Sequence, residues 1–130
     1  MIAEKSARLR VLVVDDEPLI RWSAAETLTD AGYVVIEASD AKETFHQLTV
    51  GPVPDVILLD CRLPDSNDLK LLEAVRRLAP GCPVIMMTAS DTPALVAGAA
   101  NLGAYRVVTK PLEMQNLVKL VQEAYQSRRV

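Results

Sequence analysis

The chain has 130 residues, half of them hydrophobic, and a net charge of −3 at pH 7. This length fits one domain that buries its core without disulfides or structural metal, and we expect that core over about residues 9–126. The slight acidic excess excludes a basic footprint for nucleic acid or anionic lipid, and every apolar run is far shorter than the roughly 20 residues of a membrane-spanning helix. The cysteines Cys61 and Cys82 match neither a CxxC nor a zinc-binding spacing, and nothing before Leu9 resembles an export segment. We therefore expect a cytoplasmic protein.

Short runs rich in β-branched residues alternate along the chain with longer stretches of helical periodicity. Each run is short enough for a strand, and the longer stretches carry apolar residues at helical spacing. The predicted strands cover residues 9–15, 33–37, 55–60, 83–88 and 105–109. The pattern predicts five strands, each followed by a helix.

The first two predicted helices have recognisable starting residues. The first begins near Pro18, a favourable first helical position, and stops at Gly32. Its apolar stripe consists of Ile20, Ala24, Leu28 and Ala31. The second begins at Asp40, which has capping-box spacing to Glu43. Its predicted stripe consists of Ala41, Phe45 and Leu48.

The last three predicted helices differ in composition. The third ends at Pro80-Gly81, the fourth begins around residues 91–93, and the last covers about residues 113–126. The stripes of the third and last helices consist of Leu71, Leu72, Val75 and Leu78, and of Met114, Leu117, Val121 and Ala124. The fourth consists almost entirely of small residues and contains Gly98, where glycine costs about 1 kcal/mol relative to alanine. We expect it to be the least stable helix.

Alternating strands and helices predict a doubly wound α/β domain. Its five-stranded parallel sheet would have the order 2-1-3-4-5, with helices on both faces, because parallel crossovers are almost always right-handed. Ligands of such sheets bind beyond the carboxyl ends of the strands, where the strand order reverses. The acids that reach this edge from the first and third strands are Asp15, Asp16, Glu17 and Asp60. Thr88 ends the fourth strand, and Lys110 follows the fifth at the same edge.

Carboxylates gathered at close range repel one another unless a positive charge lies among them. Carboxylate and carbonyl oxygens are the ligands that Mg²⁺ takes in proteins, usually with phosphate as a further ligand. An aspartate in such a site can act as a nucleophile and form an aspartyl-phosphate, while metal and lysine neutralise the phosphoryl oxygens. The sheet edge therefore predicts a Mg²⁺-dependent phosphoryl site.

Four motifs at successive strand ends carry a family resemblance. They are VLVVDDEP at 11–18, VILLDCRLP at 56–64, MTAS at 87–90 and GAYRVVTKP at 103–111. In this order and spacing they resemble the receiver domain of two-component response regulators, over nearly the whole chain. The resemblance implies one receiver domain over residues 1–130, in which the polar end, residues 126–130, is either a true C-terminus or the start of a linker.

The resemblance also implies roles for particular residues. Asp60 is the phosphoacceptor, Thr88 hydrogen-bonds the phosphoryl group, and Lys110 pairs with its charge. The implied Mg²⁺ ligands are Asp15, Asp16, the Asp60 carboxylate and the backbone carbonyl of Arg62. Glu17 stays outside this ligand set, as an acid that favours the dipole of the first helix.

The implied partners are those of a signalling domain rather than of an enzyme. A sensor histidine kinase or a histidine phosphotransfer protein would supply the phosphoryl group from a phosphohistidine. Phosphorylation would then switch a surface that controls an effector domain absent from this chain, another partner, or an activation-dependent homodimer. The only catalysis implied is self-catalysed phosphotransfer and autodephosphorylation.

The chain departs from the family pattern in two places. Asn67-Asp68 stands where many receivers have Asp-Gly. Val107 stands three residues before Lys110, where the family usually has an aromatic residue. The nearby aromatic, Tyr105, is two residues early, and strand alternation predicts it on the same face as Val107.

Alternative functions depend on the same residues. A haloacid-dehalogenase-type phosphatase needs a second aspartate two residues after the first, where Arg62 stands. A flavin carrier or nucleotide enzyme needs a phosphate-binding loop after the first strand, and this loop is acidic. Taken singly, Thr88 could cap the following loop and Lys110 could be a solvated strand-end lysine. A phosphate-independent interaction module remains the alternative, with a Mg²⁺-dependent phosphohydrolase behind it.

Overall fold

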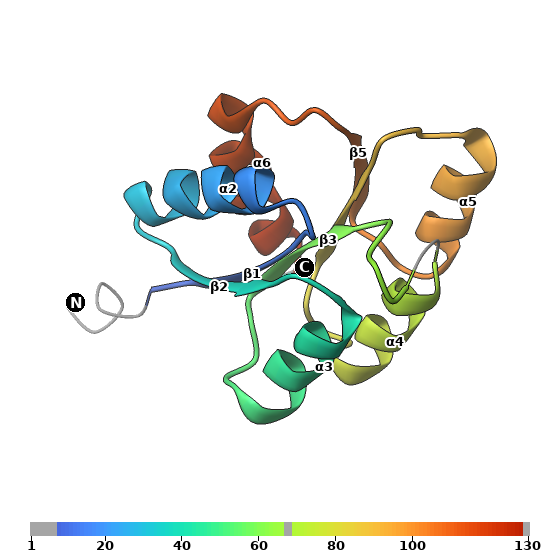
Figure 1. Cartoon of the computed structure of the whole chain (residues 1–130), viewed down its shortest axis with the longest axis horizontal. Helices are drawn as coiled ribbons and strands as arrows, with labels where there is room; N and C mark the ends of the chain where they lie inside the picture. Colours follow the sequence, from blue (N-terminus) through green and yellow to red (C-terminus); the bar gives the residue numbers. More distant parts are fainter. Residues whose placement is uncertain (1–7, 67–68, 129–130) are drawn as a thin grey trace.

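A computed structural model of the chain describes residues 8–66 and 69–128, in which strands and helices alternate (Figure 1). The strands are β1 (Arg10–Val14), β2 (Val34–Ala38), β3 (Val56–Asp60), β4 (Val84–Thr88) and β5 (Arg106–Thr109). They pair in parallel in the order β2-β1-β3-β4-β5. The predicted topology is confirmed, and each strand lies within two residues of its predicted ends.

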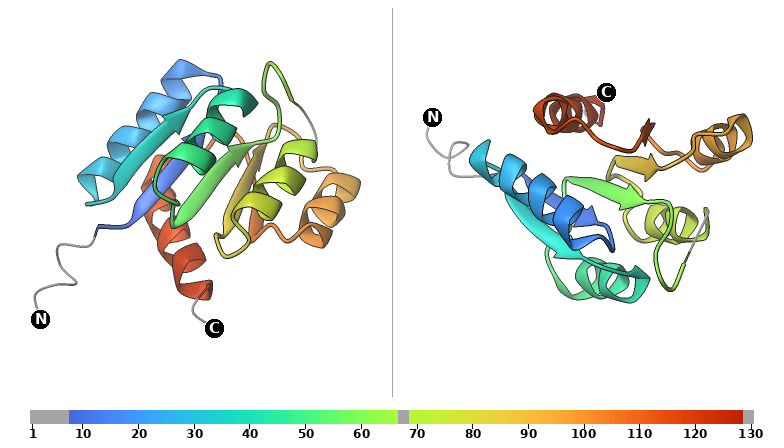
Figure 2. Two further views of the ribbon diagram at one scale, coloured as in Figure 1. Left: turned by 90° about the horizontal axis from the view of Figure 1, so that it is seen from below. Right: turned by 45° about the horizontal axis from the view of Figure 1, so that its top comes forward.

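The helices cover both faces of this sheet, as Figure 2 shows. They are α2 (Pro18–Asp30), α3 (Ala41–Val50), α4 (Lys70–Leu78), α5 (Pro93–Asn101) and α6 (Met114–Ser127). On one face lie α2 and α6, and on the other lie α3 and α4, with α5 beside α4 toward the β5 edge. The predicted doubly wound α/β class is therefore confirmed.

Two apolar cores lie on the two faces of the sheet. The α3–α4 core contains Leu12, Leu59 and Leu72, and the α2–α6 core contains Leu28, Leu58 and Val121. Successive residues of β3 enter opposite cores, because strand side chains alternate between faces. All five β3 residues are buried, which explains why this strand is apolar up to its last residue.

Three residues of the predicted helical stripes are exposed. Phe45 is 37% exposed, and the buried position of α3 is taken by Thr44, whose hydroxyl donates to the Asp40 carbonyl at 2.8 Å. Leu78, the last residue of α4, is 47% exposed. These two predictions were wrong, since helical periodicity locates an apolar face but not the extent of the surface that covers it. Ala31, also predicted inward, is exposed after the end of α2.

The prediction that Tyr105 shares a face with Val107 was also wrong. Val107 packs against the α3–α4 core, whereas Tyr105 packs against the α2–α6 core. The reason is that β5 begins at Arg106, so strand alternation does not extend back to Tyr105. Arg106 instead lies over the Tyr105 ring, 5.4 Å from its centroid.

Two sequence predictions concern residues outside the described ranges. These are the Asn67-Asp68 departure and the last two residues of the polar segment 126–130. Within the described residues, no helix is both long enough and apolar enough to cross a bilayer.

The buried and exposed leucines of α4 provide a matched test of this core. Leu72 is fully buried, so we expect Leu72→Ala to lower the free energy of unfolding by about 2–5 kcal/mol, through lost burial and a residual cavity. Leu78→Ala removes the same atoms from an exposed position of the same helix and should change it by only about 0.5 kcal/mol. Urea denaturation followed by circular dichroism measures both. Equal losses of unfolding free energy in the two variants would show that α4 does not pack on the sheet as described.

Candidate functional site

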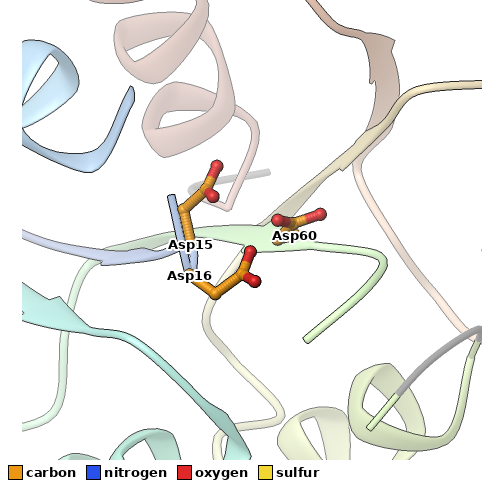
Figure 3. Close-up of side chains that lie close together, drawn as sticks. All are labelled: Asp15, Asp16 and Asp60. Atoms are coloured by element: carbon orange, nitrogen blue, oxygen red, sulfur yellow. The ribbon is translucent and has the colours of Figure 1, made fainter. Parts of the chain in front are cut away.

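Acidic side chains gather where β1 and β3 end side by side. Val14 pairs with Leu59 in the sheet register, so the next residues, Asp15 and Asp60, lie at the same level of the sheet edge. Figure 3 shows their carboxylates close together, with that of Asp16 beside them. The convergence predicted from the sequence is confirmed for these three acids.

Lys110 lies against the two buried members of this group. Asp15 is fully buried and Asp60 is 6% exposed. The Lys110 Nζ lies 2.9 Å from Asp15 Oδ2 and 3.0 Å from Asp60 Oδ2. The backbone N–H of Lys110 donates to the Thr88 carbonyl at 2.7 Å, which fixes the start of the loop that carries the ammonium. Burying two carboxylates requires such a partner, because an unpaired buried charge is strongly unfavourable.

Backbone amides hold the other oxygens of the two carboxylates. The N–H of Glu17 donates to Asp15 Oδ1 at 2.9 Å, and the N–H of Arg62 donates to Asp60 Oδ1 at 3.1 Å. Asp15 Oδ2 is buried and accepts no hydrogen bond among the described residues, although the Lys110 ammonium is close enough for an ion pair. This oxygen therefore has capacity for a further positive ligand.

Two residues of the site make contacts that the sequence did not predict. The Glu17 carboxylate lies 3.2 Å from Lys110 Nζ and adds a third acid around the ammonium. Arg21 donates to the Asp15 carbonyl at 2.7 Å and pairs with Glu37 at 3.1 Å. Arg21 therefore joins the β1 and β2 ends, a contact between distant segments that no local pattern indicates.

Burial and charge shift the pKa values of the central pair. Burial raises the pKa of the Asp60 carboxyl, and Asp15 adds a smaller upward effect, against the hydrogen bonds from Lys110 and Arg62. Burial alone would lower the pKa of Lys110, but the Asp15 and Asp60 carboxylates outweigh it and raise that pKa. The lysine is therefore held as an ammonium, and Asp60 gains from any further cation that favours its charged form.

The acid group meets the requirements of a divalent cation site. Asp15, Asp16 and Asp60 each offer a carboxylate oxygen, and these oxygens lie within 4.8 Å of one another. Hard oxygen donors suit Mg²⁺, and the buried Asp15 Oδ2 is an acceptor that such an ion would satisfy. The residues present therefore fit the predicted Mg²⁺, which these three aspartates would hold. The Arg62 carbonyl as a further ligand stays a prediction.

Thr88 lines the same cleft as Asp60. It is 6% exposed, and its hydroxyl both donates to the Ser90 carbonyl and accepts from the Ser90 N–H, at 3.1 Å each. The cleft has a volume of about 810 Å³. Its lining includes Asp16, Asp60, Arg62, Thr88 and Lys110. The structure thus brings these predicted residues to one cleft, with Asp15 buried beneath it.

Cys61 illustrates how strand alternation separates neighbours at this site. It follows Asp60 directly, yet it packs in the α3–α4 core while Asp60 lies beside Lys110. Cys61 thus shares a face with Leu59 and lies away from the site, although it is adjacent to Asp60 in the sequence.

Comparison with known sequences identifies relatives over most of the chain. A family model described as the response regulator receiver domain matches residues 11–122. The DNA-binding transcriptional regulator NtrC of Klebsiella pneumoniae is 38% identical over 113 residues, which are 86% of this chain and 24% of that protein. The transcriptional regulatory protein PhoP of Escherichia coli is 32% identical over 114 residues, 88% of this chain and 51% of that protein. The chain thus spans about a quarter to a half of these relatives.

Solved structures with the same fold cover nearly all of the chain. A CheY-like response regulator receiver domain protein from Methanospirillum hungatei superposes with a TM-score of 0.89 at 28% identity, covering 95% of this chain and 98% of that one. NtrX from Brucella abortus superposes with a TM-score of 0.86 at 28% identity, covering 95% of this chain and 28% of that one.

The acid group predicts unequal effects of two neighbouring acids on Mg²⁺ binding. Asp16→Asn should weaken Mg²⁺ binding about tenfold, a loss of about 1.4 kcal/mol, because it removes one anionic ligand. Glu17→Gln should have a smaller effect, since Glu17 contacts Lys110 rather than the acid group. Calorimetric Mg²⁺ titration compares the two variants with the parent. A larger loss for Glu17→Gln would contradict this ligand set.

Proposed function

This chain belongs to the response regulator receiver domain family, and we propose that Asp60 accepts a phosphoryl group in a Mg²⁺-dependent reaction. The chain is a signalling domain, and phosphorylation of one carboxylate is the event by which it would signal. The observation that carries the assignment is the position of Asp60, a buried carboxylate at the end of the central strand that faces both Lys110 and the acid pair.

The reaction is a transfer from a phosphohistidine to a carboxylate. An Asp60 oxygen attacks phosphorus, the bond from phosphorus to the histidine nitrogen breaks, and the electron pair of that bond stays on the imidazole, which takes a proton. Mg²⁺, when bound, neutralises charge that develops on the phosphoryl oxygens. Catalysis is then mostly positioning and charge stabilisation, as is typical of phosphoryl transfer.

Three groups around Asp60 would position and stabilise the reacting atoms: the Arg62 N–H, the Lys110 ammonium and the Thr88 hydroxyl. The Arg62 N–H on Oδ1 and the Lys110 ammonium near Oδ2 hold the carboxylate in one orientation before reaction. Lys110 then pairs with the charge of the phosphoryl group. Thr88 supplies a hydroxyl at the cleft wall, which must leave Ser90 to reach that group.

The partners of the chain follow from the same proposal. A sensor histidine kinase or a histidine phosphotransfer protein supplies the phosphoryl group, in the cytoplasm. The response is read by an effector domain, by another protein or by a second copy of the chain. The greater length of the NtrC and PhoP relatives supports an attached effector as the first of these readers.

Transmission of the signal is proposed to run through α5. Phosphorylation would draw Thr88 away from Ser90 and release the loop that leads to the Thr92 cap of α5. This helix has one buried residue, Ala99, fewer than any other described helix, so its position is weakly fixed. Val107 is short and stiff at χ1, and Tyr105 lies in the other core, so neither provides an aromatic switch on the Val107 face.

The acceptor assignment predicts the behaviour of one conservative variant. Incubation with acetyl phosphate and Mg²⁺ should add one phosphoryl group to the parent chain, and Asp60→Asn should abolish the addition because it removes the nucleophilic carboxylate. Asp30→Asn, at the exposed end of α2, is the matched control and should react like the parent. Intact-protein mass spectrometry measures all three.

Each other result of that experiment identifies a different function. An unmodified parent chain would favour a phosphate-independent interaction module. Repeated release of phosphate from the donor, without an Asp60 adduct, would favour a phosphohydrolase. Equal labelling of Asp60→Asn would show that another residue is the acceptor.

The proposed route through α5 predicts where the structure responds. Beryllofluoride with Mg²⁺, a mimic of the phosphoryl group, should shift backbone amide resonances most across residues 88–100 and little at Tyr105 and Val107. The same additions to Asp60→Asn control for effects that do not depend on the acceptor. Strong changes at Tyr105 with α5 unmoved would show that the tyrosine carries the signal instead.

A further inference from the structure

The loop that follows Asp60 is tied to the beginning of α3 by one side chain. Asp65 Oδ1 accepts from the Ala41 N–H at 2.8 Å, and its Oδ2 accepts from the Lys42 N–H at 3.1 Å. These amides belong to the first turn of α3, where backbone N–H groups have no partner within the helix. A carboxylate at this position is also favoured by the helix dipole.

A tight turn connects Asp65 to the acceptor. Leu63 and Ser66 exchange two backbone hydrogen bonds, of 2.7 and 3.2 Å, which place Asp65 between them at the tip. Leu63 is buried in the α3–α4 core and anchors the turn from below. The turn begins directly after Arg62, whose N–H holds Asp60 Oδ1. A short, hydrogen-bonded segment therefore joins Asp65 to the amide that holds Asp60.

We propose that Asp65 is a positioning residue for phosphoryl transfer, which orients Asp60 by fixing the loop that carries the Arg62 amide. The proposal rests on the proposed function of Asp60. Asp65 does not line the cleft, so it acts through the loop rather than on the reacting atoms. Its two-oxygen contact fixes both the distance and the rotation of the loop relative to α3.

The ionised form of Asp65 suits this task. The hydrogen bond from the Ala41 amide holds the pKa of the Asp65 carboxyl below its usual value against the opposing effect of burial, and the Lys42 amide adds a smaller lowering effect. Both oxygens are then acceptors. Asparagine has one acceptor oxygen and would present an NH₂ group to the second amide, so it can keep only one of the two hydrogen bonds.

A simpler explanation of these contacts is that Asp65 only caps the N-terminus of α3 and has no effect on Asp60. Asp40 provides the control that separates the two, because its Oδ1 caps the same helix by accepting from the Glu43 N–H at 2.8 Å. Asp40→Ala and Asp65→Ala each remove one carboxylate from the same helix end. Only Asp65→Ala detaches the acceptor loop.

The experiment measures two quantities on the full chain for the parent, Asp65→Ala, Asp65→Asn and Asp40→Ala. The first is the rate of phosphorylation by acetyl phosphate with Mg²⁺, followed by intact mass. The second is hydrogen exchange of the Arg62 amide, which reports the hydrogen bond to Asp60 without any phosphoryl transfer. Urea denaturation shows the loss of stability in each variant.

Asp65→Ala should slow phosphorylation about tenfold or more, because misplacement of a reacting group by a fraction of an ångström is costly. Arg62 exchange should accelerate by about as much, since the amide loses its fixed partner. Asp65→Asn should be intermediate, and Asp40→Ala should stay within about twofold of the parent in both measurements. Asp40→Ala removes the same charge from the same helix end, so it also controls for the change of charge.

Equal slowing in Asp40→Ala and Asp65→Ala would overturn the proposal and leave a helix cap only. Parent-like rates in Asp65→Ala would overturn it as well. If Asp65→Ala does not fold, Asp65→Asn decides by the same two measurements. If the parent is not phosphorylated, the proposed function fails, and Arg62 exchange alone then decides whether Asp65 fixes the loop.

Discussion

The structure depends on one interaction, in which two buried carboxylates share a single ammonium group. Asp15 and Asp60 are held at the same sheet edge, and each lies within 3.0 Å of Lys110. Their charges are tolerated in a buried place only because all three groups are fixed relative to one another. The fixed parts are β1, β3 and β5, whose ends supply one group each. The apolar strands therefore serve the site directly, by preventing the acids from moving apart.

The shared ammonium also leaves the acids short of positive charge. Lys110 faces Asp15, Glu17 and Asp60, and Asp16 adds a further carboxylate beside them. One cation among four acids favours the binding of another. Burial, with a smaller effect of Asp15, raises the pKa of Asp60, so its charged form also gains from a further cation. Burying these acids close together is unfavourable in free energy, and for the same reason the site favours a divalent cation and an incoming phosphoryl group.

The sequence predicted those parts of the site that depend on strand ends. Asp15, Asp60, Thr88 and Lys110 follow short apolar runs, so the parallel topology alone brings them to one edge. Contacts between irregular segments have no comparable pattern in the sequence. The Asp65 carboxylate, for example, binds the first turn of α3, which lies more than twenty residues earlier in the chain. Errors inside elements had another cause. Phe45, Leu78 and Tyr105 were misplaced because periodicity gives the direction of a side chain but not the end of the surface or strand it meets. The Arg62 carbonyl and the phosphoacceptor role of Asp60 remain predictions.

Gly98 shows how a local cost can serve the larger arrangement. Glycine inside α5 costs about 1 kcal/mol relative to alanine. A Cβ at this position would come within 2.5 Å of Leu69 Cδ1, so the absence of a side chain lets Leu69 pack directly on the helix. Leu69 lies at the end of the segment that follows Asp60, and Thr92 caps the same helix at the end of the loop that follows Thr88. The loop after Thr88 therefore leads into α5, and the segment after Asp60 contacts the same helix through Leu69. A change in either segment acts on the described helix that has the fewest buried residues.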